Sequence, residues 1–443
     1  MTTLLLVLAT QPTPPAPWPT DRLTHVGGAV FPGLVLAEDA AGVDFRVVRR
    51  QPGRPTVTLT SRFPRAEIRS LVKLADADRA KLREKLAALD PANESARLDA
   101  VVLAEADWPG SPVIARRYES DQFVLVSAVP EDITRQAAVR LEQLSAALVR
   151  LLPPRRPAAA PTTVFLTGTP AEYQKLLGRA GAGPLANPAV YDPVAGRVVV
   201  GTDLADRVAK RADARRSHQT QRGTIDTYEA EVRKLYRAAP VELDRHLRTA
   251  VAQRQKLRDA DKANDRRVDQ AVERALTLLA HEAFHAYVAT FLYPPAAGGG
   301  LPRWLDEGLA QIVETAVLEG GELRVGHADP ARLERAKDAV AGRGEPLLPV
   351  AELVAGGGAA FLAKHADRTA AADRAYLTAW AMAMHLTFDR KLLAGDGFEA
   401  YRLAAAGDPV AAFERWTGRT LPEYERELTG YVKRLRPAGT LNP

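Results

Sequence analysis

The sequence predicts an α+β protein that carries a small all-β module near its N-terminus. Short apolar runs between Leu23 and Leu59, punctuated by glycines, are typical of strands. Farther along, strand-like runs alternate with helical stretches in a βαβ-like order. Beyond residue 203 the sequence is charged and then helical, so helices should dominate the C-terminal part.

The N-terminal module is expected over residues 21–75. Its strand signal is an apolar run at residues 34–36, followed by Val43, Phe45 and Val47 alternating with polar neighbours. This pattern fits a small β-barrel or β-sandwich. The module holds no cluster of catalytic residue types, so we expect a structural or docking role.

Residues 1–20 are expected to be a leader or a disordered tail. An apolar run from Leu4 to Ala9 precedes a proline-rich stretch and resembles the apolar core of a secretion signal. The basic residues that normally precede such a core are missing. The run favours an extracytoplasmic location, periplasmic or secreted, over a cytoplasmic one. No other segment of the sequence is apolar enough to span a bilayer.

A charged helical connector is expected over residues 76–115, and the main domain over residues 116–435. This domain should open with a strand at residues 123–126 and a helix with leucines on one face. The leucines of that face are Leu141, Leu144, Leu148 and Leu151. The next expected elements are strands at 164–166 and 197–200 and a short helix at 170–177.

Residues 204–270 should form a charged helical insertion. Apolar residues are sparse there, so an exposed helical hairpin is expected, with breaks at Gly223 and Pro240. Three histidines in charged stretches are interpreted as surface residues: His218, His246 and His365.

Composition excludes several classes of function. The chain of 443 residues has no cysteine, which excludes disulfides, cysteine-ligated zinc and thiol catalysis. Its 60 basic and 54 acidic residues give a net charge of +6, which permits attraction to an anionic membrane or envelope surface. No basic run interleaved with aromatics occurs, so we expect no nucleic-acid partner.

The chemistry is expected at the end of a long helix. His281 and His285 are four residues apart in His281-Glu282-Ala283-Phe284-His285, so both imidazoles lie on one helical face and can reach one cation. Zinc suits such a pair. Glu282 lies one residue round from the first ligand, where it can act as a general base toward water. Two histidines on an ordinary helix remain the alternative.

A third ligand is needed for a catalytic zinc site, and a second helix supplies it. Glu307 lies in the first turns of a stretch that begins near Pro302. The adjacent Asp306 would point about 100° away on a helix, and Glu307 has the longer reach. Gly308 should let this helix approach the histidine helix closely, and Glu314, two turns on, is expected to be too distant.

The two segments together resemble the gluzincin signature, in which Trp-Leu-x-Glu-Gly, here residues 304–308, gives the third ligand. Over about residues 116–435 the chain is also similar to an uncharacterised bacterial family, common in planctomycetes, with a peptidase MA-like domain. Its similar stretches are residues 118–126, 191–193 and 376–380. The resemblance implies a zincin fold: a mostly β upper subdomain with a mixed sheet, an active-site helix and a helical lower subdomain. The charged insertion obscures the usual substrate-binding edge strand.

The resemblance further implies a zinc metallopeptidase that acts on a protein or peptide substrate. Gluzincins often stabilise the oxyanion with a Tyr or His, and the downstream candidates are Tyr376, Trp380 and His385. Tyr376 is our choice, although it can equally belong to an apolar stripe with Trp380. The rival functions are a catalytically silent zincin-fold scaffold and a surface or nucleic-acid adaptor that uses the basic hairpin.

Overall fold

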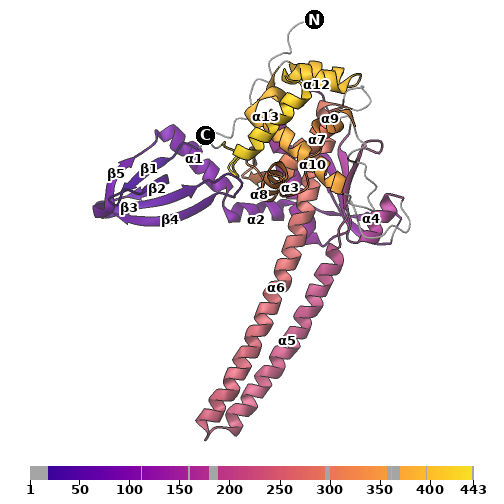
Figure 1. The fold of residues 1–443 in the computed structure, drawn as a ribbon. Helices are drawn as coiled ribbons and strands as arrows, with labels where there is room; N and C mark the ends of the chain where they lie inside the picture. The colour runs from indigo at the N-terminus through magenta and orange to yellow at the C-terminus, as the bar shows by residue number, and fades with distance from the viewer. Residues whose placement is uncertain are drawn as a thin grey trace.

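The structure is a computed structural model with an N-terminal sheet, a mixed α/β body and a long helical hairpin that projects from the body (Figure 1). The expected leader up to residue 17 and the predicted surface residue His365 lie outside the described residues. The structure describes residues 18–110, 112–157, 160–178, 188–294, 300–356, 361, 370–395 and 397–441.

The N-terminal module is one antiparallel sheet of five strands in the order β4-β3-β2-β1-β5. Its strands are β1 (Asp21–His25), β2 (Val30–Glu38), β3 (Gly42–Arg49), β4 (Val57–Pro64) and β5 (Ile68–Val72). The expected all-β module is therefore confirmed, but the sheet is open, with β4 and β5 at its edges, and is neither a barrel nor a sandwich.

Both faces of this sheet are apolar. Val35 packs with Leu23 and Phe45 on one face, whereas its neighbour Leu34 packs on the other face. Helix α1 (Asp76–Ala88) covers that second face with Leu82 and Leu86, and Trp18 joins the same cluster. Helix α1 therefore covers the face that a second sheet would cover in a sandwich.

The region expected to be a connector also supplies strands to the body. Helices α1 and α2 (Pro91–Ala100) agree with the expected helical character. Strand β6 (Ala104–Asp107) and the start of β7 (Ile114–Glu119) also fall within residues 76–115, and they pair with each other. The sequence of β6, Ala-Glu-Ala-Asp, has no large apolar or β-branched residue, and the strand is largely exposed at the sheet edge.

The body contains a six-stranded mixed sheet in the order β10-β11-β9-β8-β7-β6. Strands β8, β9 and β11 run parallel, and β6, β7 and β10 are antiparallel to their neighbours. The remaining bounds are β8 (Phe123–Ser127), β9 (Thr162–Leu166), β10 (Ala189–Asp192), β11 (Arg197–Val200), α3 (Glu131–Leu151) and α4 (Pro170–Leu176). The predicted strands at 123–126, 164–166 and 197–200 and both predicted helices are confirmed. Helix α3 buries Leu141 against Leu125 of the sheet and Leu279 of the helix that carries the histidines.

The predicted helical hairpin is confirmed as α5 (Leu204–Leu235) and α6 (Pro240–Tyr287), which lie side by side (Figure 1). Pro240 stands at the start of α6, as expected. The break predicted at Gly223 is wrong, because α5 runs through it; one glycine costs a helix interior only about 1 kcal/mol.

His218 and His246 were expected on the surface, which is also wrong. Both are half-buried between α5 and α6. Nδ1 of His218 lies 2.5 Å from Oδ1 of Asp261, and Nδ1 of His246 lies 2.5 Å from the Tyr228 hydroxyl. In a thin two-helix hairpin the interface has to use such polar pairs, because apolar residues are sparse.

The C-terminal part is helical, as predicted. Its helices are α7 (Arg303–Glu314), α8 (Pro330–Val340), α9 (Val350–Ala355), α10 (Ala370–Met384), α11 (Gly397–Ala404), α12 (Pro409–Thr417) and α13 (Leu421–Arg434), with a hairpin of β12 (Val317–Glu319) and β13 (Glu322–Arg324). Helix α10 is central, and Trp380 is buried in one core with Trp304 and Phe413. No helix in the described part of the chain combines the length and apolar character needed to cross a bilayer.

Candidate metal centre

Three side chains converge where the C-terminal end of α6 packs against α7. His281 and His285 come from α6, and Glu307 comes from α7. Nε2 of His281 lies 3.1 Å from Nε2 of His285 and 3.3 Å from Oε2 of Glu307. Nε2 of His285 lies 3.7 Å from the same carboxylate oxygen. The structure thus brings together the three residues that the sequence proposed as ligands.

The shape of this triangle fits a small cation. In a tetrahedral site with bonds of about 2.0–2.1 Å, neighbouring ligand atoms are about 3.3 Å apart. Oε2 of Glu307 is buried and has no hydrogen-bond partner among the described residues. A buried carboxylate oxygen without a partner is costly, and a cation between the three atoms would satisfy it. This His-His-Glu group can therefore hold a metal ion.

Two further carboxylates hold the outer nitrogens of the imidazoles. Oε2 of Glu314 lies 2.6 Å from Nδ1 of His281, and Oδ2 of Asp306 lies 2.8 Å from Nδ1 of His285. These contacts favour a proton on Nδ1 and leave Nε2 free to face the triangle. The expectation that Glu314 is too distant is therefore wrong.

The directions of the two helices explain the position of Glu314. The earlier histidine on α6, His281, meets the later acid on α7, whereas the later histidine, His285, meets the earlier acid, Asp306. The helices are thus antiparallel, and α7 runs alongside the whole histidine pair. Glu314, two turns after Glu307 on α7, therefore lies beside His281.

Gly308 does not serve the purpose predicted for it. A Cβ atom at this position would lie 2.4 Å from the carbonyl oxygen of Ala379 and 2.7 Å from Cβ of Ala383, both in α10. The glycine therefore permits close packing of α7 on α10, on a different side of α7 from the histidines. The reason is that residues 307 and 308 point about 100° apart on the helix.

Electrostatics of the cluster favour positive charge. Burial lowers the pKa of His281, but the neighbouring carboxylates of Glu307 and Glu314 outweigh it and raise the value to about 9. Burial is likewise outweighed at His285, where Asp306 and Glu307 raise the pKa well above its usual value. Burial raises the pKa of Glu307, yet the two imidazoles and Arg303 hold it below its usual range. A metal ion bound between these side chains would supply the positive charge that the carboxylates favour.

Arg303 is a component that the sequence did not reveal. Its Nη2 pairs with Oε1 of Glu307, and its Nη1 lies 3.9 Å from Oδ2 of Asp306. The available signal was the spacing of four residues between Arg303 and Glu307 on one helix. Arg332, from α8, pairs in the same way with Glu314. Each acid on α7 that contacts the histidines therefore has an arginine beside it.

Glu282 faces the edge of the body sheet. Its buried side chain accepts a hydrogen bond from the backbone N–H of Tyr191 through Oε2, at 2.6 Å. Tyr191 belongs to β10, an edge strand of the six-stranded sheet, and its hydroxyl shares a hydrogen bond with the side chain of Thr290. An edge strand of the body sheet thus borders the centre.

Of the three downstream candidates, only Tyr376 is influenced by the charges of the metal centre. Tyr376 is half-buried on α10; burial, together with the charges of Glu307 and Glu282, raises the pKa of its hydroxyl. Trp380 lies in the apolar core. His385 is fully buried against the rings of Tyr424 and Tyr431. Gln311 of α7 donates to the backbone oxygen of Tyr376 at 2.9 Å, which ties α10 to the ligand helix.

Comparison with known proteins gives no family. No family model matches the chain, and neither a curated protein nor a solved structure is significantly similar to it. What the centre does must therefore be argued from its own geometry.

Proposed function

We propose that the protein is a zinc-dependent peptidase of the gluzincin type, in which His281, His285 and Glu307 hold the ion. The observation that carries the proposal is the triangle of ligand atoms beside a carboxylate, Glu282, that is anchored to a sheet edge. Two imidazoles and one carboxylate with an open fourth position are a ligand set of catalytic zinc. Metals that prefer all-oxygen ligands, such as calcium and magnesium, fit this set less well.

The surrounding architecture supports a zincin-like arrangement. A mixed sheet ends in an antiparallel edge strand, β10, next to the helix that bears the histidines, and a helical region follows it. An extended peptide can add to the edge of such a strand through main-chain hydrogen bonds. We therefore propose protein or peptide segments in extended conformation as substrates.

Glu282 is proposed as the general base. A bound zinc ion would polarise the peptide carbonyl and make water acidic enough to be deprotonated near neutral pH. The Tyr191 N–H holds Oε2 of Glu282, and within the described residues Oε1 makes no hydrogen bond. Oε1 can then accept the proton of the attacking water and pass it to the leaving amine.

Tyr376 is proposed to stabilise the oxyanion. Burial, aided by Glu307 and Glu282, raises the pKa of its hydroxyl, so the group stays protonated at neutral pH and can donate a hydrogen bond. A Tyr376→Phe variant should keep its metal and lose about 100-fold in kcat, as measured for loss of one oxyanion donor in other enzymes. Equal kcat in the variant would assign this tyrosine to packing alone.

The proposal is tested by metal analysis and peptide turnover with three proteins: wild type, Glu282→Gln and Glu273→Gln. Glu273 is exposed on the same helix and provides the matched control. All three should contain about one zinc ion per chain after supplementation. Only Glu282→Gln should lose activity, by at least about 100-fold, because an amide keeps the hydrogen bond to Tyr191 but cannot take a proton.

Each other outcome has a defined meaning. A chain without metal would remove the peptidase proposal. Zinc without turnover of any peptide in a diverse library would indicate a catalytically silent scaffold. Turnover by Glu282→Gln at a comparable rate would show that another group is the base.

A further inference from the structure

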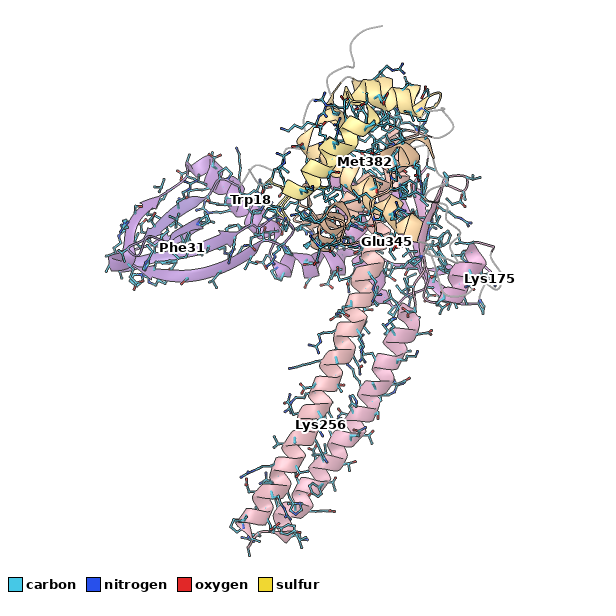
Figure 2. The ribbon with its side chains drawn as sticks, viewed as in Figure 1. Trp18, Phe31, Lys175, Lys256, Glu345 and Met382 are labelled. Atoms are coloured by element: carbon cyan, nitrogen blue, oxygen red, sulfur yellow. The ribbon has the colours of Figure 1, made fainter. Side chains whose placement is uncertain are left out.

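The helical hairpin concentrates the positive charge of the protein. We call residues 204–270 the arm; they hold 17 Lys and Arg residues and 11 Asp and Glu residues, a formal charge of +6. This equals the net charge of the whole chain, so the acidic and basic residues of the rest of the protein are equal in number. The arm projects from the body with its side chains in open surroundings, as at Lys256 (Figure 2).

The contacts that hold the arm together use side chains that face the interface between its two helices, including one at its tip, residues 233–241. Val232 and Ala250 are buried between the helices, and Arg254 bridges to Glu229. Near the turn the ring of Tyr236 stacks on His246, with centroids 4.8 Å apart. The turn is therefore fixed by inward-facing residues, and the outward-facing ones are available for another purpose.

Apolar and basic side chains occur together on the outside of the tip. Leu235 is 76% exposed and Val241 is 80% exposed, on either side of the turn. Arg233, Lys234 and Arg237 are also exposed and make no ion pair within the described residues. No buried contact of the arm uses any of these five side chains.

The acids around the turn do not neutralise this group. Glu242 pairs with Arg245, and Asp244 pairs with Arg248, both within the first turns of α6. Glu231 lies before the tip, on the part of α5 that leads back to the body. The three cations and two apolar side chains thus lie exposed within nine residues at the end of the arm.

We propose that the tip docks on an anionic lipid surface. Each basic side chain near such a surface is attracted to the headgroups, and the exposed leucine and valine can enter the interfacial region. A nucleic-acid backbone would satisfy the cations but would offer Leu235 and Val241 no apolar surroundings. The mixture of both residue types at one end of the arm therefore favours lipid.

Docking through the tip would set the distance between the metal centre and the lipid surface. Helix α6 runs without a break from Pro240 at the tip to Tyr287, past both histidines. His281 is 41 residues from Pro240, which corresponds to about 60 Å along the helix. The arm would act as a spacer that holds the centre on the body well above the surface. This inference does not depend on peptidase activity.

The first test is co-sedimentation of the full chain with vesicles of neutral phosphatidylcholine, with or without anionic phosphatidylglycerol. Binding to the anionic vesicles should be at least about 10-fold tighter and should weaken with salt. A tip variant, Arg233→Gln, Lys234→Gln and Arg237→Gln, should lose that preference. A control with equal charge loss in the middle of the arm, Lys256→Gln, Arg258→Gln and Lys262→Gln, should keep most of it.

The second test locates the contact. Because the chain has no cysteine, a single Leu235→Cys or Lys256→Cys carries one environment-sensitive fluorophore. Anionic vesicles should shift the emission of the label at 235 to the blue and leave the label at 256 unchanged. Equal shifts at both positions, equal weakening by the two triple variants, tighter binding to duplex DNA or tip-dependent dimerisation without lipid binding would each overturn the proposal.

Discussion

Glu314 lies against His281, with Oε2 of the acid 2.6 Å from Nδ1 of the imidazole. This contact has a counterpart at the other end of the centre, where Asp306 lies 2.8 Å from Nδ1 of His285. Three acids of one helix thus divide their roles: Glu307 faces the inner nitrogens, and the two others orient the rings. The orientation of a ligand by its outer hydrogen bond sets both its tautomer and its basicity.

The first prediction ranks these acids by metal affinity. Glu307→Gln should weaken zinc binding most, because it removes a ligand charge. Glu314→Gln and Asp306→Asn should each weaken binding by about 10–100-fold, as is typical of outer hydrogen-bond partners. Glu334→Gln, at an exposed acid of α8, should change nothing. Competition titration against a chelator gives the order, and a larger loss in either outer variant than in Glu307→Gln would contradict the assignment.

What the sequence could predict here was local. His281 and His285 share a face of one helix, so their spacing alone places them together. Glu307 could be chosen over Asp306 by reach and direction within one helix. The position of Glu314 depends on the antiparallel packing of α6 and α7, which no spacing within a helix contains. The same limit explains the edge strand β10, whose Tyr191 meets Glu282 only through tertiary packing.

Gly308 gives the second prediction. In Gly308→Ala the new methyl group would contact the backbone oxygen of Ala379 at 2.4 Å, so α7 and α10 must move apart. Such overpacking costs about 1–3 kcal/mol and should lower Tm. Because Glu307 is the adjacent residue, zinc affinity should fall as well.

A matched glycine provides the control for this variant. Gly223 lies inside α5, and a Cβ atom there would meet nothing within 4 Å. Gly223→Ala should therefore stabilise the helix by about 0.5–1 kcal/mol and leave zinc affinity unchanged. A Gly308→Ala protein that is as stable as Gly223→Ala would show that the α7–α10 approach is not as close as described.

The third prediction concerns where the chain can be shortened. The sequence placed the connector up to residue 115, but β6 and the start of β7 lie before that point and belong to the body sheet. A sequence of alanines and acids without large apolar or β-branched residues could not reveal β6, whose place is set by pairing with β7. Removal of residues 1–100 should leave a chain that unfolds cooperatively and binds zinc, whereas removal of residues 1–115 should be clearly less stable.

The shorter truncation has its own cost. Arg324 of β13 donates to the backbone oxygen of Gln51, and Glu319 of β12 accepts from the backbone N–H of Thr56. These contacts dock the N-terminal module on the body and are lost in both truncated chains. Calorimetry of the two proteins separates the effects, and equal stability would show that β6 and the start of β7 contribute nothing to the body.

The last prediction uses the buried histidine that the metal centre does not contain. His385 is fully buried, and its Nε2 lies 3.4 Å from Oδ2 of Asp389 and 3.7 Å from Oε1 of Glu427. Tyr424 and Tyr431 pack against its ring. Burial lowers the pKa of His385 to about 4. The two acids oppose this shift, and the positive charges of Arg390 and Arg434 add to it.

The neutral imidazole is therefore the form that the native state prefers. Between about pH 6.5 and pH 4 the unfolded chain binds a proton at His385 that the native chain does not, so this residue's contribution to stability is complete above pH 6.5 and is lost as the pH falls toward 4. The loss amounts to about 3 kcal/mol by linkage. In His385→Gln this titration is removed, so the stability difference between wild type and variant, measured by denaturant unfolding, should shrink by that order between pH 7 and pH 4. A difference that stays constant over this range would show that His385 titrates normally in the folded protein.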